Sequence, residues 1–335
     1  MPKKSSPKRQ QKASPADLFR APIDRGDVEA VKKLIADGAK PNLEATQRAA
    51  DFSNKAHTMT RRQDAGSFFR RPTAKQLKQA EVDSLAGFQM LEAMLAAGAP
   101  VPERLCSAAN AGNTRLALLL IERGADVNYE PPMGTPLENA VKSGDLETLR
   151  ALIKAGADVN HQKYFGTVLA RAVEAKNLAA AEELIRAGAD VKLKPKFASR
   201  VLMQAVEEGL PEFVDLFLRH GAEVDAKDGV SIGEHGEPEV RIEGGCRITH
   251  MKDPEYVREV TPLIVAVRKG FVPIVKMLVA AKADLEAVDS NRLTAMSYAV
   301  KEHNAAMIKL LAAAGAKALR YTEGSRELAW ITAAR

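Results

Sequence analysis

The stretch Thr135–Gly166, TPLENAVKSGDLETLRALIKAGADVNHQKYFG, contains one complete structural unit. Thr135, followed by a proline and then by Glu138 three residues on, is typical of a capping box at a helix N-terminus. Apolar residues recur at helical spacing on both sides of Gly144, which predicts two short helices joined by a tight turn. Gly156 is expected to end the second helix in a left-handed conformation. Such a pair cannot bury its own apolar face, so it must stack on similar units.

The unit recurs at intervals of 32 or 33 residues from Gly124 to Gly221 and from Lys282 to Gly315, and two intervals of about twice that length indicate insertions, because the flanking units are intact. The positions equivalent to Gly156 are Gly38, Gly98, Gly124, Gly188, Gly221, Lys282 and Gly315. Where Lys282 replaces glycine, we expect a looser helix end or another geometry. A small residue recurs in six first helices, where neighbours must approach closely: Ala108, Ala140, Ala172, Ala205, Ala266 and Ala299.

The repeat period, together with the residues shared at equivalent positions of the units, resembles the ankyrin-repeat family. The match is carried by Thr-Pro-Leu at 135–137 and 261–263 and by Gly-Ala-Asp-Val-Asn at 124–128 and 156–160, and it covers roughly residues 15–317. The resemblance implies an all-α solenoid of about eight helix-turn-helix units with β-hairpin finger loops and two long insertions. The histidine that follows Thr-Pro-Leu in the family is replaced by Glu138 and Ile264. Because that histidine braces neighbouring hairpins, its loss is expected to affect local stability but not the fold.

Composition and segment lengths narrow the class of protein. No apolar run reaches the roughly 18 residues that a membrane-spanning helix needs, and the N-terminus lacks the apolar core of a secretory signal. Cys106 and Cys246 are far apart and favour neither a disulfide framework nor a cysteine-rich metal site. We therefore expect a soluble, monomeric, cytoplasmic protein, or a nuclear one if the source is eukaryotic and its basic tail acts as a signal.

Positive charge is concentrated at the N-terminal end. Residues 1–80 hold 18 Lys or Arg against 8 Asp or Glu, whereas the rest of the chain holds 31 against 35. The basic segment 1–13 has little to bury and is expected to be disordered. It could contact nucleic acid or an acidic partner or act as a nuclear signal, but a solubilising tail is the favoured interpretation.

The second unit is expected to carry an insertion at about 56–75, between a first helix over 46–55 and a second over 86–97. Phe68 and Phe69 lie here among four arginines: Arg61, Arg62, Arg70 and Arg71. Basic residues interleaved with aromatic ones can bind nucleic acid. The favoured alternative is that the phenylalanines pack back on the repeats, because no glycine-aromatic RNA-binding signature is present.

A second insertion is expected at about 226–260, within a repeat domain that spans 14–317. Its alternation of β-branched and polar residues, separated by glycines, predicts an extended β-hairpin or small meander. Loops this long usually have a function or are disordered. His235, Cys246 and His250 do not have the spacing of a metal site, so no metal is expected. Residues 318–335 are expected to supply a helix that caps the last unit.

Sequence motifs of catalysis are missing. The chain has no phosphate-binding glycine-rich loop, no HExxH, no GxSxG and no Cys-x-x-Cys. Neither an enzyme nor a cofactor is therefore expected, although a third hypothesis gives the 226–260 insertion an activity of its own.

In the ankyrin-repeat family, partners bind a concave side that is built from first helices and finger loops. The resemblance implies contact residues near the ends of the first helices: Lys142, Glu174, Glu207, Glu208, Arg268 and Lys269. Their charge changes sign along the chain and is acidic in units five and six and basic in unit seven. Residues at the predicted loop tips are further candidates, since exposed aromatic side chains often anchor partners: Tyr129, Met133, Tyr164, Phe165 and Phe197. Ordinary surface charge, and aromatic rings folded under the hairpins, remain the alternatives. We expect a scaffold, adaptor or inhibitor that binds one or more proteins, with nucleic-acid binding by residues 1–80 as the alternative.

Overall fold

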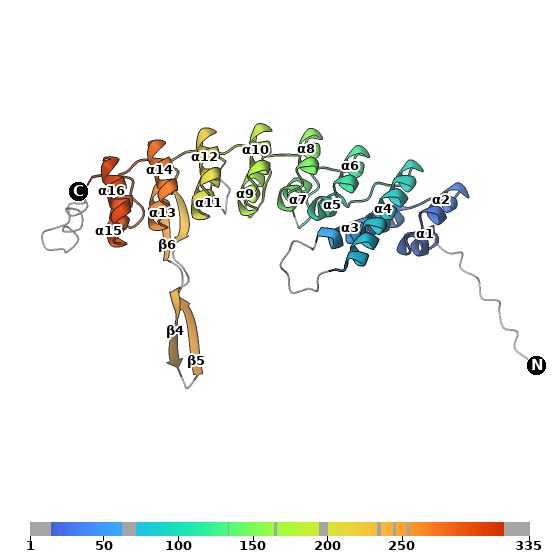
Figure 1. The fold of residues 1–335 in the computed structure, drawn as a ribbon, viewed down its shortest axis with the longest axis horizontal. Helices are drawn as coiled ribbons and strands as arrows, with labels where there is room; N and C mark the ends of the chain where they lie inside the picture. Colours follow the sequence, from blue (N-terminus) through green and yellow to red (C-terminus); the bar gives the residue numbers. More distant parts are fainter. Residues whose placement is uncertain are drawn as a thin grey trace, which may run out of the picture. The chain divides into compact units, whose positions relative to one another are not determined.

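The computed structural model describes residues 15–61, 72–132, 134–163, 166–193, 200–232, 236–243, 246–252 and 255–317. In that part, sixteen helices follow one another in pairs, and the strands lie in loops between them (Figure 1). The chain is an all-α repeat solenoid that divides into two compact units, 1–159 and 160–335. The basic tail over 1–13 and the capping helix expected within 318–335 lie outside the described residues.

The N-terminal unit stacks its helix pairs so that first helices contact first helices and second helices contact second helices. These helices are α1 (Pro15–Asp24), α2 (Val28–Ala36), α3 (Leu43–Arg61), α4 (Ala74–Ala96), α5 (Leu105–Ala111), α6 (Thr114–Glu122), α7 (Pro136–Ser143) and α8 (Leu146–Lys154). Ala108 on α5 and Ala140 on α7 are at most 1% exposed, and α5 packs directly on α7. The small residue of the repeat therefore lies where two first helices meet.

The start of α7 forms the capping box that the sequence predicts. The Thr135 hydroxyl accepts a hydrogen bond from the Glu138 amide at 3.2 Å, and the Glu138 carboxylate accepts one from the Thr135 amide at 2.8 Å. Asn139 adds two hydrogen bonds, to the carbonyls of Gly134 and Thr135, at 3.2 and 3.0 Å. Glu138 and Asn139 are both buried. Their hydrogen bonds lie in the region where the family's histidine is replaced, and the effect of that replacement on local stability stays a prediction.

Polar residues at the ends of the repeats link one pair to the next. Asn128 donates to the Gly156 carbonyl at 3.3 Å and accepts from the Asp158 amide at 2.9 Å. In the other unit, Asn160 makes the same two bonds, to Gly188 and Asp190, at 3.2 and 2.8 Å. The asparagine of the Gly-Ala-Asp-Val-Asn tail thus satisfies backbone groups of the following repeat.

The pair α3–α4 differs from the sequence-based expectation. Helices were expected over 46–55 and 86–97, with an insertion at about 56–75, but α3 continues to Arg61 and α4 already begins at Ala74. The stretch between the helices is therefore 62–73. Thr73 caps α4, since its hydroxyl accepts from the Gln76 amide at 3.3 Å. This capping box starts the helix well before the segment that repeat spacing identified.

Close contact along their sides holds α3 and α4 together. Gly87 faces Ser53 so closely that a Cβ atom at Gly87 would lie 2.6 Å from the Ser53 amide nitrogen. The Ser53 hydroxyl donates to the Ser84 carbonyl at 3.0 Å. Asn113, at the start of α6, donates to both the Ser53 hydroxyl and the Asn54 side chain at 3.2 Å. Both long helices are therefore fixed through buried contacts in their middle turns.

The C-terminal unit repeats the same design. Its elements outside the insertion are β1 (Gln162–Lys163), β2 (Gly166–Thr167), α9 (Val168–Glu174), α10 (Leu178–Arg186), α11 (Val201–Glu207), α12 (Pro211–Arg219), α13 (Pro262–Arg268), α14 (Val272–Ala280), α15 (Ala295–Lys301) and α16 (Ala305–Ala313). Strands β1 and β2 form a short antiparallel finger. Its first helices again pack through residues at most 1% exposed: Ala172, Ala205, Ala266 and Ala299.

The insertion between α12 and α13 contains antiparallel strand pairs, as expected for the hairpin, the first of the two alternatives that the sequence left open. Strand β3 (Asp228–Ile232) pairs with β6 (Glu255–Val260), and between them β4 (Gly236–Glu243) pairs with β5 (Cys246–Lys252) (Figure 1). Asp228, which is buried, accepts hydrogen bonds from the Arg200 amide at 2.9 Å and from its guanidinium at 3.3 Å. The base of the hairpin is thus tied to the start of α11.

Lys282 shows that a helix end can keep its geometry without glycine. Lys282 has φ +64°, and its amide and the next one bond to the carbonyls of Val279 and Leu278, both at 3.0 Å. Gly156, with φ +89°, makes the equivalent bonds at 3.1 and 3.0 Å. The expectation of a looser or different cap at Lys282 was therefore wrong: the left-handed turn is retained, with a side chain present.

Candidate interaction surface

Charged residues gather where successive first helices of the C-terminal unit end. Helix α11 packs against both α9 and α13, so their last turns are neighbours. We call these positions the first-helix row: Glu174, Glu207, Glu208, Arg268 and Lys269. Glu174, Glu208 and Lys269 are exposed, whereas Glu207 and Arg268 are half-buried. In the N-terminal unit, Lys142 occupies the corresponding exposed position at the end of α7.

Members of the row contact neighbouring charges and backbone groups. Glu174 pairs with Arg171 at 2.8 Å, and Glu208 lies 3.9 Å from the Lys176 ammonium group. The Lys269 ammonium group donates to the backbone carbonyl of Glu207 at 3.1 Å. Glu208 and Lys269 therefore also contribute to the contact between neighbouring repeats. These pairs are exposed, so each contributes little to stability.

Glu207 is the unusual member of the row. Burial removes water from its carboxyl group and raises its pKa to about 7, while Lys269 lowers the pKa and Asp228 and Glu208 raise it. Within the described part of the chain, its carboxylate makes no hydrogen bond. A half-buried carboxyl group without a hydrogen bond can accept one from a cationic group, which would draw it to the ionised form.

Arg268 is anchored by an aromatic side chain that is itself held by Asp289. Its guanidinium lies 4.5 Å from the centre of the Tyr298 ring on α15, a cation–π contact. The buried Tyr298 hydroxyl donates to Asp289 at 2.5 Å. The other Asp289 oxygen accepts from the amides of Asn291 and Leu293 at 2.8 and 3.0 Å. Arg268 therefore presents a fixed positive charge rather than a freely moving one.

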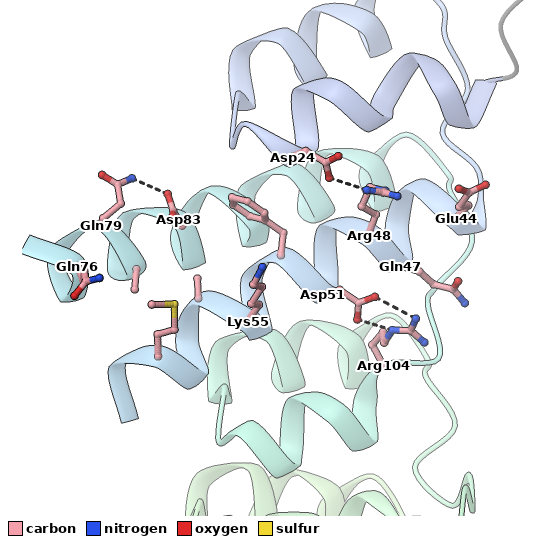
Figure 2. Close-up of a pocket in the computed structure, with 14 residues that line it drawn as sticks. Asp24, Glu44, Gln47, Arg48, Asp51, Lys55, Gln76, Gln79, Asp83 and Arg104 are labelled. Carbon is pink, nitrogen blue, oxygen red and sulfur yellow. Dashed lines mark hydrogen bonds and ion pairs between the residues drawn. The ribbon is translucent and has the colours of Figure 1, made fainter. Parts of the chain in front are cut away.

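A groove lies in the N-terminal unit, between α1, α3, α4 and the residue before α5 (Figure 2). Its volume is about 810 Å³. Two ion pairs stand beside it: Arg48 with Asp24 at 2.7 Å, and Arg104 with both oxygens of Asp51 at 2.7 and 3.2 Å. Lys55 lies on α3 between these pairs and the polar side chains of α4 (Figure 2).

Comparison with known proteins agrees with this architecture. Residues 102–163 and 242–321 match the family model described as ankyrin repeats (3 copies). These two stretches of the chain therefore contain ankyrin repeats. Among solved structures, the crystal structure of the human ASB11 ankyrin repeat domain has a similar fold, with a TM-score of 0.51 and 23% identity over 69% of this chain and 97% of that one. A search of curated proteins found no match.

The ankyrin-repeat finger tips are only partly described. Tyr129 is 40% exposed, and its carbonyl accepts a weak hydrogen bond from the Cys106 thiol at 3.7 Å. Burial raises the pKa of that thiol to about 11, so it stays protonated. The remaining predicted tip residues, Met133, Tyr164, Phe165 and Phe197, lie outside the described residues. So do Arg62, Arg70 and Arg71 of the nucleic-acid alternative, while Arg61 is the last residue of α3.

Sequence reasoning missed two features of this ankyrin-repeat protein. The groove was missed because helices were expected only over 46–55 and 86–97, which leaves out the end of α3 and the N-terminal half of α4. The Asp289–Tyr298 contact was missed because its partners are nine residues apart across a loop. A usable signal was the sequence Asp289-Ser-Asn291, since an aspartate often accepts from the amide two residues on.

The described residues show no arrangement of metal ligands. No group of three or more His, Cys, Asp or Glu side chains among them could hold an ion. In the same part of the ankyrin-repeat protein, every helix is too short or too polar to cross a bilayer.

Proposed function

We propose that this ankyrin-repeat protein is a non-enzymatic module for protein–protein interaction, acting as a scaffold, adaptor or inhibitor. Ankyrin repeats are generally modules of this kind. The observation that supports it best is the first-helix row, where first helices packed side by side place charged residues at their neighbouring last turns. We place the protein in the cytoplasm as a monomer, or in the nucleus if its basic tail acts as a signal in a eukaryotic cell.

Glu207 and Glu208 give the row a preferred kind of contact. A lysine or arginine of the partner would find the Glu207 carboxylate half-buried and unbonded, with Glu208 beside it. Charge complementarity of this sort sets orientation and association rate more than affinity. Lys269 and Arg268 on the next helix favour an acidic group one repeat further along. In the N-terminal unit, exposed Tyr129 is the candidate aromatic anchor.

Capture from native lysate, followed by mass spectrometry, tests the row. The variant Glu207→Gln/Glu208→Gln removes both charges and nearly preserves side-chain volume. We expect it to lose about tenfold in retained partner without a lower melting temperature, as loss of close charge pairs commonly costs this much. The control Glu212→Gln/Asp215→Asn makes the same change on the second helix α12, where both residues are exposed. Equal capture by both variants would remove the row from the interface.

The charge of residues 1–80 supports nucleic-acid binding as a second candidate. Retention on a duplex DNA column should then fall steeply between low and moderate salt, because phosphate contacts release counterions. Deleting residues 1–14 while changing Arg62, Arg70 and Arg71 to glutamine should abolish retention and leave α3 and α4 complete. Retention that is insensitive to salt, or unchanged in this variant, would dismiss this candidate.

A further inference from the structure

The groove of the N-terminal unit is elongated. It follows a single face of α3, whose lining residues recur every three or four positions: Glu44, Gln47, Arg48, Asp51, Phe52, Lys55, Ala56 and Met59. At 1.5 Å per residue this stripe is about 22 Å long. The other wall is the N-terminal half of α4, from Gln76 to Asp83. A groove of this length suits a rod-like occupant better than a compact small molecule.

One end of the groove is apolar. Phe52, Ala56 and Met59 of α3 meet Ala80 of α4 there. The two alanines are only 6% and 3% exposed, so the floor is low and leaves room for side chains from outside. Because α3 and α4 already pack along their flanks, a third helix laid in this groove would rest on ridges of both.

The charges in the groove are not equally available. Asp24 neutralises Arg48, and Asp51 neutralises Arg104. Lys55 and Glu44 are exposed and, among the described residues, have no ion-pair or hydrogen-bond partner. They lie eleven residues apart on the same face of α3, or about 16 Å. Asp83 of α4 also lines the groove, and its carboxylate accepts a hydrogen bond from Gln79 at 2.7 Å. On the α3 wall, the groove therefore offers one positive and one negative position at a fixed spacing, with the apolar end next to the positive one.

We propose that this groove binds an amphipathic α-helix of a partner protein. The bound helix presents an acidic side chain to Lys55 and apolar side chains to the floor around Ala56 and Ala80. About eleven residues from the acid, on the same face, it presents a basic side chain to Glu44. Recognition of this type reads anchors at helical spacing along one face of the ligand. This inference rests on the proposed protein-binding function, but none of the first-helix row takes part, so the two surfaces can be tested separately.

A selection experiment tests the groove with defined probes. Helical 18-residue peptides, randomised on one face and displayed on phage, are selected against the full-length protein and against two variants. Lys55→Glu reverses the charge at the centre of the groove. Lys78→Glu, the control, makes the same change at an exposed lysine of α4 that does not line it. Both sites are exposed, so circular dichroism should show unchanged helix content and melting temperature.

Wild-type protein and Lys78→Glu are expected to enrich the same peptides, with an acid beside an apolar cluster. Lys55→Glu should bind those peptides about tenfold more weakly and enrich ones with lysine in place of the acid. Selected peptides that bind all three proteins equally, or no enrichment of helical peptides on the wild type, would overturn the proposal. So would enrichment seen only after Phe68→Ser/Phe69→Ser, since the occupant would then belong to this chain. Peptide binding that survives Glu207→Gln/Glu208→Gln would separate the groove from the first-helix row.

Discussion

Two helix pairs of the same unit are held in different ways. In the pair α7–α8, the residues that define the helices lie at the helix ends: a buried capping box at Thr135, a left-handed glycine at Gly144 and another at Gly156. The pair α3–α4 is more than twice as long and depends on contacts along its flanks, between Ser53 and Gly87 and around Asn113. A repeat whose helix ends are marked by local residues can be predicted from its own sequence. The extents of α3 and α4 depend on contacts between the two helices.

The largest effect is expected where the flanks touch. In most helix interiors, Gly→Ala stabilises by about 1 kcal/mol. Gly87→Ala should instead destabilise by about 3 kcal/mol, because the added Cβ would lie 2.6 Å from the Ser53 amide and within 2.9 Å of its Cα. Urea unfolding followed by circular dichroism measures the sign. Gln89→Ala, on an exposed position of the same helix, is the control, and a stabilising Gly87→Ala would disprove the flank argument.

The capping boxes allow a direct comparison of the two pairs. Thr135 is 4% exposed, and Thr135→Ala should cost about 1 to 2 kcal/mol, since it leaves the buried Glu138 amide without an acceptor. Thr73 makes the same box at the start of α4 but is exposed, so Thr73→Ala should cost about half as much. Thermal melts of both variants, read at 222 nm, give the ratio. Equal losses would mean that α4 depends on its end as much as α7 does.

The same contrast explains what could be predicted from sequence. Capping residues, the recurring alanine and turn glycines are local signals, so they predicted the repeats around α7 and α8. The alternation of β-branched and polar residues is also local, and it predicted the strands of the 226–260 insertion. The length of α3 and α4 could not be predicted in this way, because Ser53 and Gly87 lie 34 positions apart and only the folded backbone brings them together. Of the candidate site, the charges of the first-helix row were visible. Their pairing and the half-buried state of Glu207 were not, because both depend on neighbouring repeats.

Burial between repeats can also oppose folding, and the half-buried carboxyl group of Glu207 allows this to be tested. Its pKa is about 7 in the folded protein against an ordinary 4.5, so its contribution to stability is fully present below pH 4.5 and is lost as pH rises through 7. Glu207→Gln should therefore gain about 1 kcal/mol relative to wild type between pH 5 and pH 8, a value reduced by the side chain's remaining contact with water. Urea titrations at both pH values measure it. Glu212→Gln on exposed α12 should show no such change, and an equal change there would remove Glu207 as the cause.

The smallest effect on stability is expected at Lys282, where the left-handed turn that ends the helix is kept without the usual glycine. A side chain at φ +64° costs about 1 to 2 kcal/mol, but glycine loses more backbone freedom on folding, by about 0.5 to 1 kcal/mol. Lys282→Gly should therefore stabilise the C-terminal unit by roughly 0.5 kcal/mol. The reverse change, Gly156→Lys in the N-terminal unit, should destabilise by a similar amount, because both positions make the same two backbone hydrogen bonds. Thermal melts that move in opposite directions would show that helix ends set stability independently of their repeat. If Lys282→Gly has no effect while Gly156→Lys is costly, the ends of α8 and α14 are not equivalent, and contacts beyond the turn must support Lys282.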